Sequence, residues 1–151
     1  MQITIPGRGS IGLDQIVLDF NGTLATDGQV PAEVVELLGQ VSQRYPTYLV
    51  TADTFGTAVP FAERLGIPWR IVKTGEDKAH FIASLNGGVA AVGNGANDGP
   101  MFRAAALAIA VVGPEGAAVA ALLAADVVAP TIQDALQLLL SPARLIATLR
   151  I

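Results

Sequence analysis

Acidic and amide side chains directly follow several short apolar runs of the sequence. Asp19 and Asn21 follow the first of these runs, Asp53 follows the second, and Asn94 and Asp98 follow a later one. If the runs are parallel strands of one sheet, their carboxyl ends meet at the edge where α/β sheets bind ligands. Carboxylate and amide oxygens are suitable ligands for Mg²⁺. The spacing therefore predicts one oxygen-rich site built from distant parts of the chain.

A short turn that contains a glycine, Asn21-Gly22-Thr23, follows Asp19. Backbone amides in such a turn can surround an anion. A carboxylate that attacks phosphorus also needs a cation to offset the phosphate charge and hydrogen-bond donors for the phosphoryl oxygens. We therefore expect Asp19 to act as a nucleophile and metal ligand, with Gly22 and Thr23 contacting the phosphate.

Runs rich in Val, Ile and Ala alternate with longer amphipathic stretches, which predicts an α/β fold with a mostly parallel central sheet. A short amino-terminal hairpin is expected to turn at Pro6-Gly7-Arg8-Gly9. The expected strands of the sheet are 16–20, 47–51, 69–72, 89–93, 107–112 and 126–129. The expected helices are 31–44, 55–65, 76–85, 98–105, 115–124, 132–140 and 142–149. Because no linker or repeat divides the chain, residues 1–151 are expected to form a single domain.

Four segments resemble, in order, the motifs of haloacid-dehalogenase-like hydrolases. They are DFNGTLATDG (19–28), LVTAD (49–53), EDKAHF (76–81) and GNGANDGP (93–100). The segment GPEGAAVAALLAADVV (113–128) is similar to the end of the phosphorylation domain of P-type ATPases. The resemblance implies a Rossmann-like three-layer sandwich of the small, soluble, P-type-ATPase-like kind. It also implies a Mg²⁺-dependent phosphohydrolase or phosphotransferase, acting on phosphoesters or acyl phosphates through a phospho-Asp19 intermediate.

The resemblance also assigns roles to individual residues. Thr51 would donate its hydroxyl to a phosphoryl oxygen, and Lys78 would neutralise the phosphate and Asp19 together. Asp98 would complete the Mg²⁺ site, and Asn97 would orient Lys78. The implied residues are Asp19, Asn21, Thr51 and Lys78 for catalysis; Gly22, Thr23, Thr51, Ala52, Lys78 and Asn97 for phosphate; and Asp19, Asn21, Asn94 and Asp98 for the metal.

Two positions depart from the family pattern. Most of these phosphatases carry a general acid–base aspartate two residues after the nucleophile, where this chain has Asn21. An amide cannot exchange the proton, so turnover is expected to be slow, although the backbone carbonyl of Asn21 can still bind the metal. Asn94 replaces a metal-binding carboxylate, and weaker Mg²⁺ binding is the expected result.

The intervals between the motifs leave no room for a cap domain, because 19–51 holds one loop and one helix and 51–78 holds a helix, a strand and a turn. An uncapped site is open to water. We therefore expect a small phosphorylated substrate, or else a phosphorylated macromolecule or a second subunit of a homo-oligomer that covers the site. The membrane helices and nucleotide-binding domain of a P-type ATPase are absent, so ion pumping by this chain alone is excluded.

Composition narrows the classes of partner. The net charge is −4, and no Lys or Arg cluster suggests nucleic-acid binding. The longest apolar stretches, 104–112 and 116–125, are shorter than a membrane span requires. The chain has no cysteine, and its first residues do not resemble a signal peptide, so a cytoplasmic location is expected.

Other interpretations of the same residues stay open. Asp and Asn after strands commonly cap helices or form turns, and Thr51 could simply end a strand. His80 is expected at the surface or core edge, and Trp69 and the phenylalanines in the core. The alternative functions are a phosphate-binding or phosphoaspartate switch module, and a catalytically silent protein that retains the fold.

Overall fold

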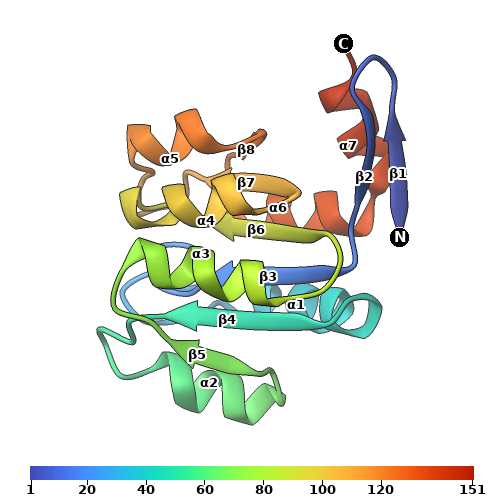
Figure 1. Ribbon diagram of the computed structural model, residues 1–151. Coiled ribbons are helices and arrows are strands. Elements are labelled where there is room, and N and C mark those ends of the chain that lie inside the picture. The colour runs from blue at the N-terminus through green and yellow to red at the C-terminus, as the bar shows by residue number, and fades with distance from the viewer.

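The computed structural model describes all 151 residues and contains a six-stranded parallel sheet and a separate two-stranded antiparallel hairpin (Figure 1). The hairpin strands are β1 (Gln2–Ile5) and β2 (Gly9–Gly12), as the sequence predicts. The strands of the main sheet are β3 (Gln15–Asp19), β4 (Thr47–Thr51), β5 (Trp69–Ile71), β6 (Val89–Gly93), β7 (Leu107–Val111) and β8 (Val127–Ala129). Their order across the sheet is β5-β4-β3-β6-β7-β8.

Helices cover both faces of this sheet, so the molecule is a three-layer sandwich (Figure 1). The helices are α1 (Ala32–Arg44), α2 (Ala58–Leu65), α3 (Gly75–Ser84), α4 (Gly99–Ala104), α5 (Val119–Ala124), α6 (Ile132–Leu140) and α7 (Pro142–Leu149), with a 3₁₀ turn, η1 (Ala96–Asp98), before α4. One apolar cluster joins α1, α2, α6 and α7 to one face, and a second joins α3, α4 and α5 to the other. The predicted α/β sandwich is confirmed.

The central strands are apolar on both sides because side chains of successive residues point to opposite faces. In β3, Ile16 and Leu18 pack into the cluster of α1 and α6, while Val17 packs into the cluster of α3 and α4. All five residues of β6 and of β7 are buried. This burial on both faces holds the strand ends, and therefore the loops that follow them, in fixed positions.

Some expected boundaries and two expected core residues were wrong. Helix α2 begins at Ala58 rather than at Phe55, and α5 begins at Val119 rather than at Glu115. Phe55 therefore lies in a loop and is 55% exposed. Trp69 is 41% exposed because β5 is an edge strand with nothing packed beyond it. The exposure of His80 agrees with the expectation.

The chain changes direction across the sheet at β3. After β3 it continues outward through β4 and β5, and then it returns to the other side of β3 to form β6. The helices that follow β3 and β6 cover opposite faces of the sheet, so the carboxyl edge between these strands is the switch-point crevice, the usual place for a ligand in this class of fold. Asp19 ends β3 and Asn94 follows β6, so both stand at this crevice.

The hairpin packs beside α7, away from that crevice (Figure 1). Its inward side chains Ile3 and Ile5 join the core, and Arg8 in its turn forms an ion pair with Asp126. The backbone N–H of Ile151 donates to the carbonyl of Pro6 at 3.0 Å. None of the helices combines the length and the apolar content needed to cross a bilayer.

Two glycines allow a test of packing with a matched control. A Cβ on Gly88 would lie 2.0 Å from the backbone oxygen of Gly12, where the hairpin meets the start of β6. A Cβ on Gly39, inside α1, would meet nothing within 4 Å. We expect Gly88→Ala to lower the free energy of unfolding by about 1–3 kcal/mol, because the added methyl group overpacks this contact. We expect Gly39→Ala to raise it by roughly 0.5–1 kcal/mol through helix propensity. Urea denaturation of both variants measures the difference, and equal effects would contradict the packing described here.

Candidate functional site

Asp19 is held at the carboxyl end of the central strand β3, where it pairs in register with Val50 of β4. The residue is 8% exposed, so its carboxylate faces the crevice from a largely buried position. Its Oδ1 accepts a hydrogen bond from Lys78 Nζ at 2.8 Å, and its Oδ2 accepts one from Thr23 Oγ1 at 3.1 Å. The structure thus joins three residues that were predicted to belong to one site.

Lys78 reaches this carboxylate from the first turns of α3, on the face of the sheet that α4 also covers. Its helix begins with a capping box, in which Thr74 Oγ1 accepts from the backbone N–H of Asp77 and the Asp77 carboxylate accepts from the N–H of Thr74. This cap fixes the helix start at Gly75, three residues before Lys78. The Lys78 side chain is 2% exposed, and its Nζ donates to Asp98 Oδ1 at 2.6 Å as well as to Asp19.

Asp98 closes the loop after β6 and is completely buried. Its Oδ2 accepts hydrogen bonds from the backbone N–H groups of Asn94 and Gly95, both at 2.9 Å. This approach requires a glycine at position 93, because a Cβ there would lie 2.4 Å from Asp98 Oδ2. One carboxylate therefore shapes the loop with one oxygen and holds the Lys78 ammonium with the other.

Thr23 and Asn94 connect the loop after β3 to the loop after β6. The Thr23 hydroxyl lies 3.3 Å from Asn94 Oδ1 as well as 3.1 Å from Asp19 Oδ2, so its single proton has two possible acceptors. Asn94 Nδ2 donates to the carbonyl of Gly116 at 3.0 Å. Gly22 has φ +77°, and a Cβ on it would lie 2.5 Å from Asn94 Nδ2, so a larger residue would separate the two loops.

Asn21 lies beside this network without joining it through its amide oxygen. Its Oδ1 is buried and has no hydrogen-bond partner. Buried polar atoms are normally paired, and unpaired ones concentrate where a ligand or water completes the site. An acceptor without a donor thus lies two residues after Asp19.

Thr51 ends β4, next to β3 in the sheet, and is 1% exposed. Its Oγ1 accepts a hydrogen bond from the backbone N–H of Asp53 at 2.9 Å. Asp53 has φ +53°, and its Oδ1 accepts from the N–H of Ala58 at the start of α2. Asp53 is therefore a turn and capping residue, and it leaves the Thr51 hydroxyl proton free for another acceptor.

One expected contact, between Asn97 and Lys78, is absent from the structure, and the phosphate-binding role expected for Ala52 stays a prediction. Asn97 was expected to orient Lys78, but its residue is exposed, and the hydrogen bonds of Lys78 Nζ go to Asp19 and Asp98. The reason is that η1 turns the Asp98 side chain inward beneath the loop. Ala52 is exposed in the loop between Thr51 and Asp53. The bond between Lys78 and Asp98 is not an expectation of the sequence, although both residues belong to the motifs.

The charges at the site do not balance. Two carboxylates, Asp19 and Asp98, share the single ammonium of Lys78. Burial, together with repulsion from Asp98, raises the pKa of Asp19 to about 6, although Lys78 and Thr23 act in the opposite direction. Burial alone would lower the pKa of Lys78, but its two carboxylate partners outweigh burial and raise it above its usual value. The site therefore has an excess of negative charge that a bound cation would offset.

The donor atoms fit a hard dication that retains part of its water shell. Asp19 Oδ2 and Asn94 Oδ1 both face the Thr23 hydroxyl, so two oxygen donors from different loops converge there. No group of three or more His, Cys, Asp or Glu side chains is placed to hold a metal ion. Oxygen donors without thiolate or imidazole match Mg²⁺ better than a transition metal. Asp98 can contribute only through Oδ1, since its Oδ2 accepts from two backbone amides.

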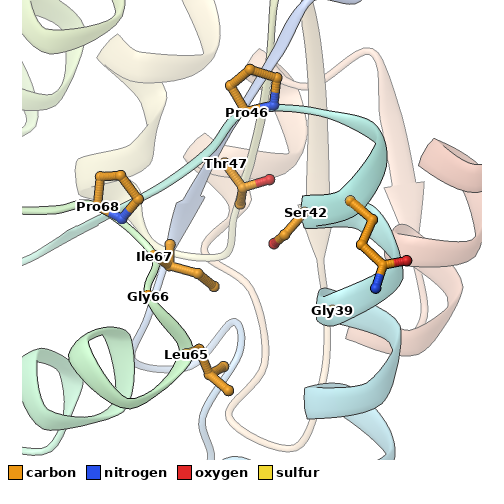
Figure 2. Close-up of a pocket in the computed structure, with 9 residues that line it drawn as sticks. Gly39, Ser42, Pro46, Thr47, Leu65, Gly66, Ile67 and Pro68 are labelled. Atoms are coloured by element: carbon orange, nitrogen blue, oxygen red, sulfur yellow. The ribbon is translucent and has the colours of Figure 1, made fainter.

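The largest hollow of the molecule does not lie at this site. It has a volume of about 490 Å³ and lies at the amino ends of β4 and β5, lined by Gly39, Ser42, Gln43, Pro46, Thr47, Leu65, Gly66, Ile67 and Pro68 (Figure 2). Two smaller hollows, of about 250 and 170 Å³, flank the loop after β3. Phe20 and Arg64 line the first, and Thr23 and Thr131 the second. The two smaller hollows thus adjoin the loop after β3, and Asp19 itself lines neither of them.

Comparison with known proteins identifies relatives of the sequence and of the fold. No family model matches the chain. An uncharacterised protein of Methanocaldococcus jannaschii is 47% identical over 62 residues, which are 41% of this chain and 67% of that protein. The 3-deoxy-D-manno-octulosonate 8-phosphate phosphatase of Moraxella catarrhalis, solved with magnesium and phosphate, has a TM-score of 0.72 at 18% identity and covers 91% of this chain and 94% of its own.

Part of an ion pump has a similar fold. A zinc-transporting PIB-type ATPase in its E2·Pi state matches with a TM-score of 0.66 at 26% identity, over 79% of this chain and 20% of the ATPase. Both structures therefore resemble this chain in fold over most of its length. The chain is thus a relative of the archaeal protein, and its fold is that of haloacid-dehalogenase-like hydrolases without a cap domain.

Proposed function

We propose that this protein is a Mg²⁺-dependent phosphohydrolase or phosphotransferase that carries the phosphoryl group on Asp19. The observation that supports this function best is the buried chain of Asp19, Lys78 and Asp98, with separations of 2.8 and 2.6 Å. It supplies a nucleophile and a fixed positive charge at the edge of the sheet where ligands bind. The phosphatase and the ATPase with the same fold support the assignment by analogy.

In the proposed reaction, a carboxylate oxygen of Asp19 attacks phosphorus, and the bond from phosphorus to the leaving group breaks. Lys78 shifts its hydrogen bond toward the phosphoryl oxygens and offsets their charge, and Thr51 donates its free hydroxyl proton to one of them. Asp19, Asn94 and the Asn21 carbonyl would hold Mg²⁺, which supplies further charge neutralisation. Water then attacks phosphorus, releases phosphate and restores the Asp19 carboxylate.

The nucleophile can be tested by two substitutions at the same loop. Asp19→Asn is expected to abolish Mg²⁺-dependent phosphate release, because an amide does not form the acyl phosphate. Asn21→Asp is expected to raise release from phosphoesters by roughly 10²- to 10⁴-fold, since it restores a general acid and base. A colorimetric phosphate assay measures both. Activity that survives Asp19→Asn would rule out this function.

The raised pKa of Asp19 gives a second test that does not depend on activity. The folded protein binds more protons than the unfolded chain between about pH 4 and 6, so this residue lowers stability as the pH rises through that range. Without Mg²⁺ we expect Asp19→Asn to raise Tm at pH 7 by at least about 2–4 °C, the shift produced by about 1 kcal/mol. The advantage should disappear near pH 4.

Thermal unfolding between pH 4 and 8 measures this effect. Asp27→Asn is a suitable control because Asp27 is exposed in a turn. The same difference between wild type and Asp19→Asn at pH 4 and pH 7 would contradict the electrostatic description. Mg²⁺ should raise Tm in the wild type more than in Asp19→Asn, because the ion offsets the charge that the variant lacks.

The buried and unpaired Oδ1 atom of Asn21 favours one second function, a phosphoaspartate switch. Without a base for the attacking water, phospho-Asp19 would persist and could change the binding of a partner or the oligomeric state. Time-resolved intact mass measurements after phosphorylation separate the two functions. A phosphorylated form that lasts for hours and alters the oligomeric state supports the switch, whereas loss within seconds supports the hydrolase.

A further inference from the structure

We propose that this protein associates with a second copy of itself through the outward face of helix α5. This face, called here the α5 surface, consists of Val119, Ala120 and Leu123 on the helix, with Val112 and Val128 beside them, and all five residues are exposed. The proposed contact lies on the side of the sheet and does not depend on phosphoryl transfer.

Helix α5 is apolar on both of its sides. Its inward residues Ala121 and Leu122 pack into the cluster that joins α3, α4 and α5 to the sheet. Its outward residues Val119 and Leu123 are four positions apart, so they share one face of the helix, and they are 68% and 83% exposed. A surface helix normally carries polar or charged residues on its outward face, as α1 does with Glu36. The chain thus leaves an apolar helix face uncovered.

The margin of the sheet extends this apolar face. Val128 of the edge strand β8 pairs in register with Ala110 of β7, so its side chain points to the face of the sheet that α5 covers. Val112 follows Ala110 by two residues and points the same way. Figure 1 shows α5 and β8 together at one margin of the molecule. The α5 surface therefore continues from the helix to the edge of the sheet.

The absence of charge on the α5 surface favours a second copy as its partner. In a two-fold contact both molecules use the same surface, so any charge near the axis would approach its own copy. Residues 116–125 carry no charge. The exposed apolar side chains of β5, Trp69 and Ile71, have Arg70 between them and Lys73 two residues further on, so a two-fold contact there would bring cations together. Of these two apolar surfaces, the α5 surface alone can pack against itself without such repulsion.

Two opposite charges flank the α5 surface. Glu115 precedes the helix, and Arg103 lies in the last turn of the neighbouring helix α4. Both residues are exposed, and neither forms an ion pair within the chain. Since α4 and α5 each connect neighbouring parallel strands, both helices run from the carboxyl edge of the sheet to its amino edge. Glu115 therefore lies toward one end of the α5 surface, and Arg103 lies toward the other.

The backbone around Glu115 is fixed before any partner binds. On one side of it, the N–H of Gly113 donates to the carbonyl of Pro130 at 3.0 Å. On the other side, the carbonyl of Gly116 accepts from Asn94 Nδ2 at 3.0 Å. A partner that pairs with the Glu115 carboxylate would therefore not have to order this loop, and ordering a loop is one of the main costs of association.

A two-fold axis near the middle of α5 sets the two α5 helices antiparallel. Val119 of each copy then faces Leu123 of the other copy, and Glu115 of each copy approaches Arg103 of the other. The apolar side chains exclude water from the centre of the contact, while the charges stay at its rim. One arrangement thus covers the exposed apolar side chains and pairs the two free charges.

Sedimentation equilibrium of the full chain, from micromolar to millimolar concentration, tests the proposed contact. We expect a reversible equilibrium between monomer and dimer. Leu123→Glu should raise Kd by at least about 10²-fold, because each dimer would bury two carboxylates that have no partner. Ile71→Glu places the same side chain on the exposed β5 edge and should leave Kd within about twofold of the wild type. Thermal unfolding of both variants verifies that they remain folded.

An exchange of the flanking charges tests the two-fold arrangement. Glu115→Arg and Arg103→Glu should each raise Kd by at least about tenfold, because each change brings like charges together twice in every dimer. The variant that carries both changes has opposite charges at the two ends again. Its Kd should return to within about threefold of the wild type.

A chain that stays monomeric at millimolar concentration would overturn the proposal. A dimer that Leu123→Glu leaves intact would also overturn it, and so would one that Ile71→Glu weakens equally, because the interface would then lie elsewhere. Failure of the double exchange to restore association would overturn the antiparallel two-fold arrangement. Loss of the dimer in Leu123→Glu together with recovery in the double exchange supports both the surface and the arrangement.

Discussion

The Lys78 ammonium is buried between the carboxylates of Asp19 and Asp98, and the rest of the site depends on this arrangement. A buried ion pair is strongly destabilised when one partner is removed, because the remaining charge stays away from water. Here two carboxylates share one ammonium, so the cluster holds one negative charge more than it neutralises. The fold tolerates this excess because a closely packed sheet and helix α3 fix each member in place. Such a site gains stability from any ligand that brings positive charge.

Local sequence signals predicted much of this structure. The strands at 47–51 and 89–93 and the helices at 132–140 and 142–149 begin and end where their residue patterns indicate. Strands buried on both faces appear as continuous apolar runs, and prolines and glycines limit the neighbouring elements. The network of Asp19, Thr23, Lys78, Asn94 and Asp98 contains only residues from the motifs. Their roles in catalysis stay predictions.

The structure differs from the sequence-based expectations where tertiary contacts determine the position of a residue. The sequence around Trp69 does not show that its strand lies at an edge, because strand order depends on the path of the whole chain. Asn97 and Asp98 are neighbours in sequence, and only the 3₁₀ turn determines which side chain points toward Lys78. The start of α2 depends on the Asp53 carboxylate, which accepts from Ala58 after a left-handed turn. The residue pattern of a single sequence does not determine the strand order, the direction of these side chains or this helix start.

Both oxygens of Asp19 are already engaged in the structure, Oδ1 by Lys78 and Oδ2 by Thr23. The resting carboxylate is therefore shielded from chance electrophiles such as alkylating agents, since an attacking lone pair must first lose a hydrogen bond. A phosphoryl group can take over those same donors with its own oxygens as it arrives, whereas an uncharged electrophile cannot. The hydrogen bonds that position Asp19, the proposed nucleophile, would thus also restrict its reactivity to anionic partners.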